Sequence, residues 1–289
     1  MTGHLLVRRP SPALADGELT HLDRAPVDAE LALRQWRGYV DAFTAYGWTV
    51  QEIEPADHHP DGVFVEDTVV VFDDLAVLTS PGAASRRGEV VTTEAALSAL
   101  PATHRLEVTR IEEPGHLDGG DVLKIDRTAY VGLTGRTDEA GIAQLAGLLE
   151  PRGWQVVAVP VTKVLHLKSG VTALPDGTVV GFPPLVDDTG AYPSFLAVPE
   201  EHGTAVVDLG VSAHGRRAVI MSADAPRTAE LYAGRGLEVV TVPITEFEKL
   251  EGCVTCLSVR IRGGQGRAEP DEPVRVRAST EQQTAPERI

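Results

Sequence analysis

Cysteine and long apolar runs are almost absent from this chain, and both absences restrict what it can be. Cys253 and Cys256 are the only cysteines among 289 residues, too few to staple an extracellular fold of this length. No stretch approaches the roughly 20 consecutive apolar residues of a membrane helix. The opening MTGHLLVRRP lacks the apolar run and cleavage site of a secretion signal. The sequence therefore predicts a soluble protein of the reducing cytoplasm.

Basic residues are also scarce, because 26 Lys and Arg stand against 42 Asp and Glu, giving a net charge of -16. Such an acidic surface repels phosphate backbones and anionic lipids, so neither nucleic acid nor membrane is expected as a partner. The charge favours small cationic ligands, although an acidic surface that only keeps the protein soluble explains the same composition.

The apolar content, 43% of the residues, is sufficient for the core of one large domain, which we expect over residues 1–262. From Gly263 onward the sequence is polar, contains several Pro and Gln residues and shows no apolar period. Residues 263–289 are therefore predicted to be a disordered tail.

Hydrophobic periodicity predicts strands and helices in a recurring order. In residues 28–47 the apolar residues fall at steps of three and four, Asp28 can cap the start and Gly47 can end the helix. The order strand, strand, helix, strand then recurs about every 40 to 60 residues, as expected for one repeated supersecondary unit. The predicted strands are 5–7, 48–53, 63–72, 75–78, 106–110, 122–125, 129–133, 155–159, 171–173, 178–181, 218–221 and 237–241, and further helices are 87–100, 138–149 and 225–235.

A glycine-rich phosphate loop is missing as well. The pair Gly119-Gly120 in LDGGD lacks the context of both the dinucleotide and the nucleoside triphosphate motif. We therefore expect no nucleotide cofactor.

The two cysteines form a C-x-x-C pair whose context is wrong for redox chemistry. A redox pair begins a helix that follows a strand, whereas this pair leads into the strand-like residues 257–261. A structural zinc site needs a second pair of ligands at similar spacing, and none is present. Two readings remain: a pair of small buried residues, or a single nucleophilic thiol, which needs a base.

His166 and Asp118 are candidates for that base and for the group that orients it. His166, in HLKSG, follows an apolar strand and is expected at a strand end, while a hydrogen-bonded structural histidine is the alternative. Asp118 precedes two glycines that allow close backbone approach, or it is an ordinary turn carboxylate. Glu66 and Asp67 are consecutive in a predicted strand, so at least one faces inward and needs a cationic partner or ligand.

Six short motifs occur in a fixed order between residues 61 and 258, namely FVEDT, PGAASRR, LDGGDVL, VGLTGRT, LHLKS and TCLS. In order and internal spacing they resemble the dimethylarginine dimethylaminohydrolases, which belong to the guanidino-group modifying enzymes. The resemblance covers nearly the whole chain except the tail. It implies a five-bladed, pseudosymmetric α/β propeller of ββαβ units, the pentein fold, which agrees with the recurrence described above.

The resemblance also implies a role for individual residues. Cys256 in TCLS matches the nucleophile, His166 in LHLKS the general acid/base, and Asp118 in LDGGD the acid that orients the histidine. The remaining matches are the acids that hold the guanidinium, Asp61, Glu66 and Asp67; the pair that takes the α-carboxylate, Arg86 and Arg136; the lid residue Leu19; and the pocket residues Ser169 and Leu250.

The reaction implied is hydrolysis of dimethylarginine, and of monomethylarginine, to citrulline through a covalent adduct on Cys256, without metal or organic cofactor, in a monomer or homodimer. Arginine deiminases, which act on free arginine, are the alternative, but they carry a helical insertion that this sequence lacks. A non-catalytic amino-acid-binding protein or a redox module also remains open. Cys253 has no counterpart in the motifs and is close enough to Cys256 to form an inactivating disulfide on oxidation.

Overall fold

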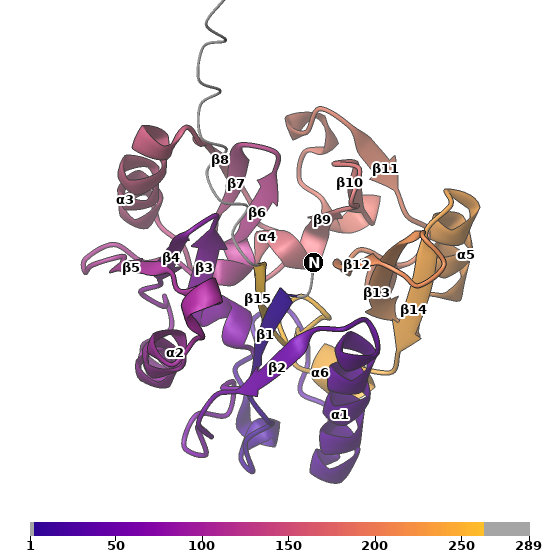
Figure 1. Cartoon of the computed structure of the whole chain (residues 1–289), viewed down its shortest axis with the longest axis horizontal. Coiled ribbons are helices and arrows are strands. Elements are labelled where there is room, and N and C mark those ends of the chain that lie inside the picture. The colour runs from indigo at the N-terminus through magenta and orange to yellow at the C-terminus, as the bar shows by residue number, and fades with distance from the viewer. Residues whose placement is uncertain (1–2, 263–289) are drawn as a thin grey trace, which may run out of the picture.

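Five three-stranded sheets are arranged around a common axis in the computed structural model, which describes residues 3–262 (Figure 1). The strands are β1 (Gly3–Val7), β2 (Thr49–Glu52), β3 (Val69–Phe72), β4 (Leu75–Leu78), β5 (Glu107–Arg110), β6 (Val122–Ile125), β7 (Thr128–Leu133), β8 (Gln155–Pro160), β9 (Val171–Ala173), β10 (Val179–Gly181), β11 (Phe195–Ala197), β12 (Val206–Val211), β13 (Arg217–Ser222), β14 (Glu238–Val242) and β15 (Val259–Arg262). The helices are α1 (Ala29–Ala45), α2 (Glu89–Ser98), α3 (Glu139–Leu149), α4 (Leu167–Gly170), α5 (Pro226–Gly234) and α6 (Thr245–Glu248). The predicted tail, 263–289, lies outside the described residues.

Every sheet has the same topology. A central strand pairs antiparallel with one neighbour and parallel with the other, as in β3-β4-β5 and β6-β7-β8. In four blades a helix crosses between the two parallel strands, because a parallel pair cannot be joined by a tight turn. The prediction of a five-bladed α/β propeller is confirmed.

The fourth blade departs from the ββαβ pattern. Between β10 and β11 the chain forms only two short 3-10 turns, Pro183–Leu185 and Thr189–Ala191. Pro183 and Pro184 supply no backbone N–H and disfavour a longer helix at this point.

The ring is closed by the two ends of the described chain. β1 pairs antiparallel with β15, with Leu5 opposite Arg260, and parallel with β2. The first and last strands thus complete one blade, and this closure sets the position of the loop before β15 that carries Cys256.

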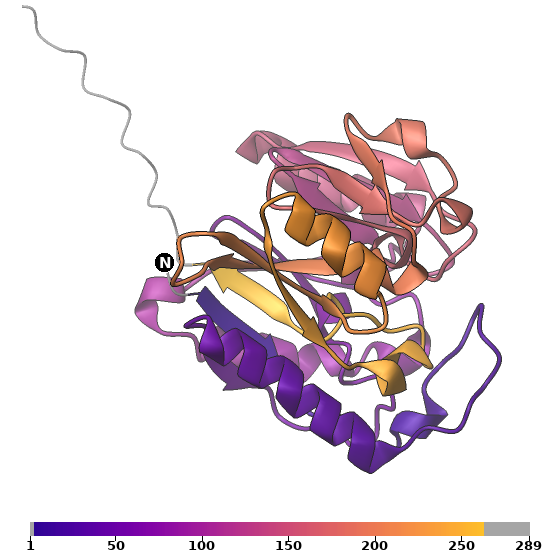
Figure 2. The same ribbon diagram turned by 90° about the vertical axis from the view of Figure 1, so that its right-hand side faces the viewer.

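Helix α1 confirms the prediction for residues 28–47. The Asp28 side chain accepts a hydrogen bond from the Leu31 backbone N–H, which caps the helix start. Its apolar face buries Trp36, Tyr39 and Phe43 in a core cluster. Figure 2 shows the long loop between β1 and α1 projecting beside the sheets.

The predicted strand 63–72 is wrong in its first half. Val65–Thr68 form a 3-10 turn, and the strand begins only at Val69. The hydroxyl of Thr68 donates to the Val65 carbonyl, a local side-chain contact that competes with strand pairing. The carboxylates of Glu66 and Asp67 are consequently both buried instead of alternating across a sheet.

Four other helices and strands were not predicted, namely β11, β12, α4 and α6. The expected strand-end position of His166 is also wrong, because β8 ends at Pro160 and His166 stands immediately before α4. No helix among residues 3–262 combines the length and apolar character needed to cross a membrane.

Gly119 is required where the segments 65–68 and 119–121 cross. A methyl group added there would overlap the Glu66 carbonyl oxygen. We expect Gly119→Ala to lower the free energy of unfolding by about 1–3 kcal/mol or more, measured by urea denaturation. Gly147→Ala is the matched control, because Gly147 lies in α3 with open space around it, and alanine should stabilise that helix by up to about 1 kcal/mol. Equal changes of the free energy of unfolding in the two variants would contradict the close contact between Gly119 and the Glu66 carbonyl.

Candidate active site

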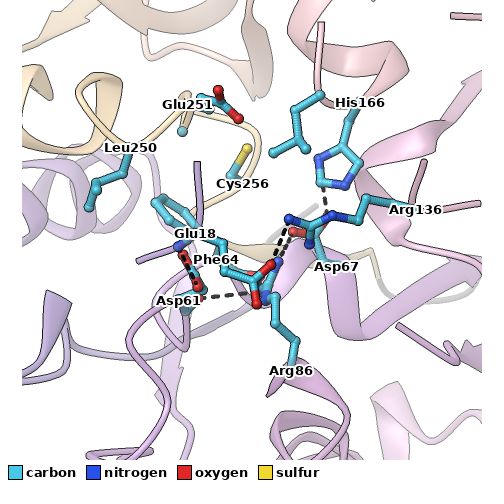
Figure 3. A pocket seen from close by; sticks show the side chains of 12 residues that line it. Glu18, Asp61, Phe64, Asp67, Arg86, Arg136, His166, Leu250, Glu251 and Cys256 are labelled. Carbon is cyan, nitrogen blue, oxygen red and sulfur yellow. Dashed lines mark hydrogen bonds and ion pairs between the residues drawn. The ribbon is translucent and has the colours of Figure 1, made fainter. Parts of the chain in front are cut away.

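A narrow pocket brings together side chains from distant segments of the propeller (Figure 3). Its free volume is about 20 Å³, close to the space that one water molecule occupies by this measure. The residues that line it are Glu18, Asp61, Phe64, Asp67, Arg86, Arg136, Leu165, His166, Leu250, Glu251, Gly252 and Cys256.

His166 is buried in the pocket wall and is oriented by Asp118. Its Nε2 lies 3.0 Å from Asp118 Oδ2, and its Nδ1 lies 4.0 Å from Asp67 Oδ1. Burial alone lowers the pKa of His166, but the carboxylates of Asp67, Asp121 and Asp118 outweigh it and raise the pKa to about 9. His166 is therefore an imidazolium at neutral pH.

Asp118 is held rigidly for this purpose. Its second oxygen accepts a hydrogen bond from the Gly82 backbone N–H at 3.0 Å, and its own N–H donates to the Thr137 hydroxyl. Asp118 is fully buried. The motif LDGGD thus supplies a fixed partner for the imidazole, with Arg136 Nη1 4.0 Å away on the other side.

Asp67 is shared between several groups. Oδ2 accepts from Arg86 Nη1 at 2.5 Å, and Oδ1 accepts from the Gly120 N–H at 2.8 Å. Burial by itself raises the pKa of Asp67, but His166 and Arg86 outweigh it and lower the pKa to about 2. Asp67 is consequently ionised at every physiological pH.

Arg86 reaches the pocket, but most of its guanidinium is already bound. Besides Asp67 it donates to both carboxylate oxygens of Glu89, at 3.1 and 2.8 Å, and to the carbonyl of Phe64 at 3.0 Å. Arg136, by contrast, is paired with Glu18 of the pocket at 2.9 Å and lies 4.0 Å from the buried Asp118. Of the two arginines predicted to bind the substrate α-carboxylate, Arg86 is therefore largely occupied by protein groups, whereas Arg136 is less so.

Cys256 is buried and directs its sulfur into the pocket that His166 also lines (Figure 3). Its Sγ lies 3.4 Å from Cys253 Sγ, and both cysteines are free thiols. The hydrogen bond with Cys253, burial and the negative charges of Glu66 and Asp67 raise the pKa of Cys256 above its usual value. In the empty pocket Cys256 is a neutral thiol.

Four predicted site residues do not line this pocket: Asp118, which is hydrogen-bonded to His166 from behind the pocket wall, and Glu66, Ser169 and Leu19. Glu66 is buried on the other side of its turn, where Oε1 accepts from Lys168 at 2.8 Å and from Arg260 at 2.6 Å. Ser169 lines a second cavity of about 330 Å³, which also reaches Cys253. Leu19 packs against the apolar cluster that contains Cys256, and the residue of its loop that reaches the pocket is Glu18.

Five lining residues were not predicted: Glu18, Phe64, Leu165, Glu251 and Gly252. Phe64 and Leu165 belong to the motifs FVEDT and LHLKS, so the motifs themselves indicated them. Glu18 and Glu251 lie in loops, where no periodicity shows which side chain turns inward.

Asp67, Asp118 and His166 are the group of described residues best placed to hold a metal ion, with one ligand atom from each within 4.8 Å of the others. Asp67 is already paired with Arg86, and Asp118 already accepts from Gly82 and His166. This arrangement favours a charge network, and the absence of a metal remains an expectation.

Comparison with known proteins gives a consistent result. A family model described as N,N dimethylarginine dimethylhydrolase, eukaryotic, matches residues 22–171. The N(G),N(G)-dimethylarginine dimethylaminohydrolase of Streptomyces coelicolor is 58% identical over 257 residues, 89% of this chain and 96% of the relative. The enzyme of the same name from Pseudomonas aeruginosa is 34% identical over 265 residues, 90% of this chain and 100% of the relative.

Solved structures agree. A mutant of the Pseudomonas aeruginosa enzyme complexed with citrulline superposes with a TM-score of 0.79 at 32% identity, covering 90% of this chain and 100% of that one. The N-terminal domain of ArgZ, a cyanobacterial arginine dihydrolase, has a TM-score of 0.78 at 20% identity, covering 91% of this chain and 99% of that one. At that identity the likeness extends to the fold alone.

Five ββαβ-type blades around a pocket with a cysteine, a histidine and several carboxylates define the pentein class of α/β propellers. Within that class, the chain belongs to the dimethylarginine dimethylaminohydrolase family.

The charge of His166 can be tested by NMR titration of its ring protons, assigned with His166→Gln. We expect a pKa near 9, so its charge stabilises the fold below pH 6.5, and that contribution is lost as pH rises through about 9. Asp67→Asn should lower this pKa, whereas Asp176→Asn, which removes a surface carboxylate paired with Arg235, should not. A titration near 6.5 would refute the assignment.

The 3.4 Å separation of the two sulfurs predicts a reversible disulfide. The hydrogen bond with Cys256 lowers the pKa of Cys253 to about 7, so hydrogen peroxide should oxidise the Cys253 thiolate to a sulfenic acid, from which the Cys256 thiol displaces water. After treatment, peptide mass spectrometry should find the two residues linked and unreactive towards iodoacetamide until a dithiol is added. Cys253→Ser is the control and should form no link. Free alkylation of both cysteines after inactivation would disprove the disulfide.

Proposed function

We propose that this chain is a dimethylargininase, a hydrolase acting on C–N bonds of linear amidines. It converts Nω,Nω-dimethyl-L-arginine and water to L-citrulline and dimethylamine, and the monomethyl compound to citrulline and methylamine. The observation that carries the proposal is one pocket lined by Cys256, His166 and the carboxylates of Asp61 and Asp67, with the buried Asp118 hydrogen-bonded to His166. Family membership supports the same reaction.

The carboxylates bind the guanidinium. Planar carboxylates match the N–H fork of a guanidinium, and Asp61 and Asp67 face the pocket with negative charge available. Asp67 is partly neutralised by Arg86, so Asp61 contributes the less compensated charge. Burial raises the pKa of Asp61, and a bound cation would lower it again. Glu66 does not contact the guanidinium in this proposal, because its carboxylate is paired with Lys168 and Arg260.

Arg136 and Arg86 receive the α-carboxylate at the opposite end. Arg136 is the principal contact, since Arg86 is largely engaged with Asp67 and Glu89. Leu250 lines the same pocket. The substrate is thus a small cationic amino acid whose two charged ends find opposite charges.

The bound cation ionises the nucleophile. Cys256 is neutral in the empty pocket, and a guanidinium placed over its sulfur favours the thiolate, whose proton is released to solvent. The thiolate attacks the guanidinium carbon and gives a tetrahedral adduct. His166, already protonated, donates a proton to the departing dimethylamine. A covalent S-alkylthiouronium remains on Cys256.

Hydrolysis completes the cycle. His166, now neutral, takes a proton from water, and the hydroxide attacks the same carbon. Collapse of the second tetrahedral adduct expels the Cys256 thiolate and yields citrulline. Asp118 keeps the imidazole in one orientation through both steps. The route needs neither metal nor organic cofactor.

Two free thiols suit a reducing cytoplasm, and the protein works as a monomer or homodimer without nucleic acid or membrane.

The nucleophile is tested by Cys256→Ser. We expect citrulline formation to fall by at least about 10³-fold, because serine is far less nucleophilic next to a protonated histidine. Mass spectrometry of the wild type trapped during turnover should find the adduct on the peptide with Cys256. Cys253→Ser is the matched control and should retain most turnover. Full activity of Cys256→Ser would refute the mechanism, and release of ammonia from arginine in place of dimethylamine would reassign the substrate.

A further inference from the structure

Glu18 reaches the pocket from the loop between β1 and α1. Its Oε2 accepts a hydrogen bond from Arg136 Nη2 at 2.9 Å, and its Oε1 accepts from the Ser85 hydroxyl (Figure 3). Its backbone N–H donates to Asp61 Oδ2 at 3.1 Å. One loop residue therefore contacts both ends of the proposed substrate site.

The contact with Arg136 is made where a ligand carboxylate is expected. Among the residues lining the pocket, Arg86 is the other arginine, and it is engaged with Asp67 and Glu89. The Arg136 side chain is only 12% exposed, whereas that of Glu18 is 40% exposed. The carboxylate on the more exposed side of this pair can thus leave towards solvent while the arginine stays in place.

The free volume shows that a side chain lining the pocket must move before a substrate binds. About 20 Å³ cannot hold an amino acid. The loop tip is fastened by Glu251, whose Oε1 accepts from the backbone N–H groups of Thr20, at 3.1 Å, and Leu22, at 2.8 Å. Glu251 has a φ of 59°, an uncommon value for a residue other than glycine. The closed loop is therefore held at two points, by Glu251 at its tip and by Arg136 at Glu18.

We propose that Glu18 is a specificity-determining residue that occupies the α-carboxylate position of the empty site. This inference rests on the proposed function. The substrate carboxylate replaces Glu18 on Arg136, so that carboxylate recognition and release of the loop occur together. A ligand without this carboxylate leaves the Glu18–Arg136 pair intact.

The exchange has a measurable consequence for affinity. In the wild type, the substrate carboxylate only replaces the Glu18 carboxylate on Arg136, so the new ion pair adds little to the binding affinity. When Glu18 has no charge, the ion pair between substrate and Arg136 contributes in full to the affinity. A guanidino ligand without the α-carboxylate gains nothing in either case.

The test compares KM values of the wild type and Glu18→Gln for dimethylarginine and for its decarboxylated analogue, dimethylagmatine. We expect the variant to lower KM for dimethylarginine by about fivefold, as for a partly exposed ion pair, with kcat changed much less. KM for dimethylagmatine should not change. Glu18→Asp, which keeps the charge on a shorter side chain, should lie between the wild type and Glu18→Gln.

Asp23→Asn is the matched control, because Asp23 is an exposed acid of the same loop with no ion pair among residues 3–262. It should leave both KM values unchanged, and an equal fall in this variant would attribute the effect to net charge. A rise in KM for dimethylarginine in Glu18→Gln would overturn the inference, because Glu18 would then bind the substrate itself. If the wild type is active and Glu18→Gln leaves KM for dimethylarginine unchanged, only the role of Glu18 is rejected. Absence of citrulline from every methylated arginine in the wild type would overturn the proposed function as well.

Discussion

The site depends on one buried carboxylate, that of Asp67. It accepts from Arg86 with one oxygen and from the Gly120 N–H with the other, and it stands 4.0 Å from the imidazole of His166. These contacts join the turn before β3, the segment before α2, the glycine pair before β6 and the residue before α4. An isolated buried charge would be costly, and this mutual satisfaction makes the cluster stable as a unit.

Charge compensation also explains the resting state of the pocket. Cys256 is neutral, His166 is protonated, and Glu18 neutralises Arg136. Each of these charges can change when a zwitterionic amino acid with a cationic side chain enters the pocket. The guanidinium favours the thiolate, and the ligand carboxylate takes the place of Glu18. Binding and activation of the nucleophile therefore follow from the same redistribution of charge.

Much of the fold could be predicted from the chain. The helix after Asp28, the hairpins and the repeated order of elements follow from periodicity, and the pentein fold and the family are confirmed. Local contacts defeated the strand prediction at 65–68, where a threonine hydroxyl bonds the backbone. Strand β11 has only three residues, and the register of β12 shifts between Asp208 and Gly210, so neither shows a regular alternation. The roles of the site residues remain predictions, with Cys256 and His166 brought to one pocket and Asp118 hydrogen-bonded to His166.

The sequence by itself determined which chemical groups are present and their order: the thiol, the imidazole, the acids and the arginines, each in a short motif. Only the tertiary structure decided which of them meet. Of the two adjacent acids, Asp67 faces the pocket while Glu66 pairs with Lys168 and Arg260, because a turn instead of a strand sets their directions. Likewise Glu18 reaches Arg136 because ring closure brings loops from different blades to one end of the axis. Motifs record local geometry, whereas the pairing of charges 118 positions apart depends on the packed ring.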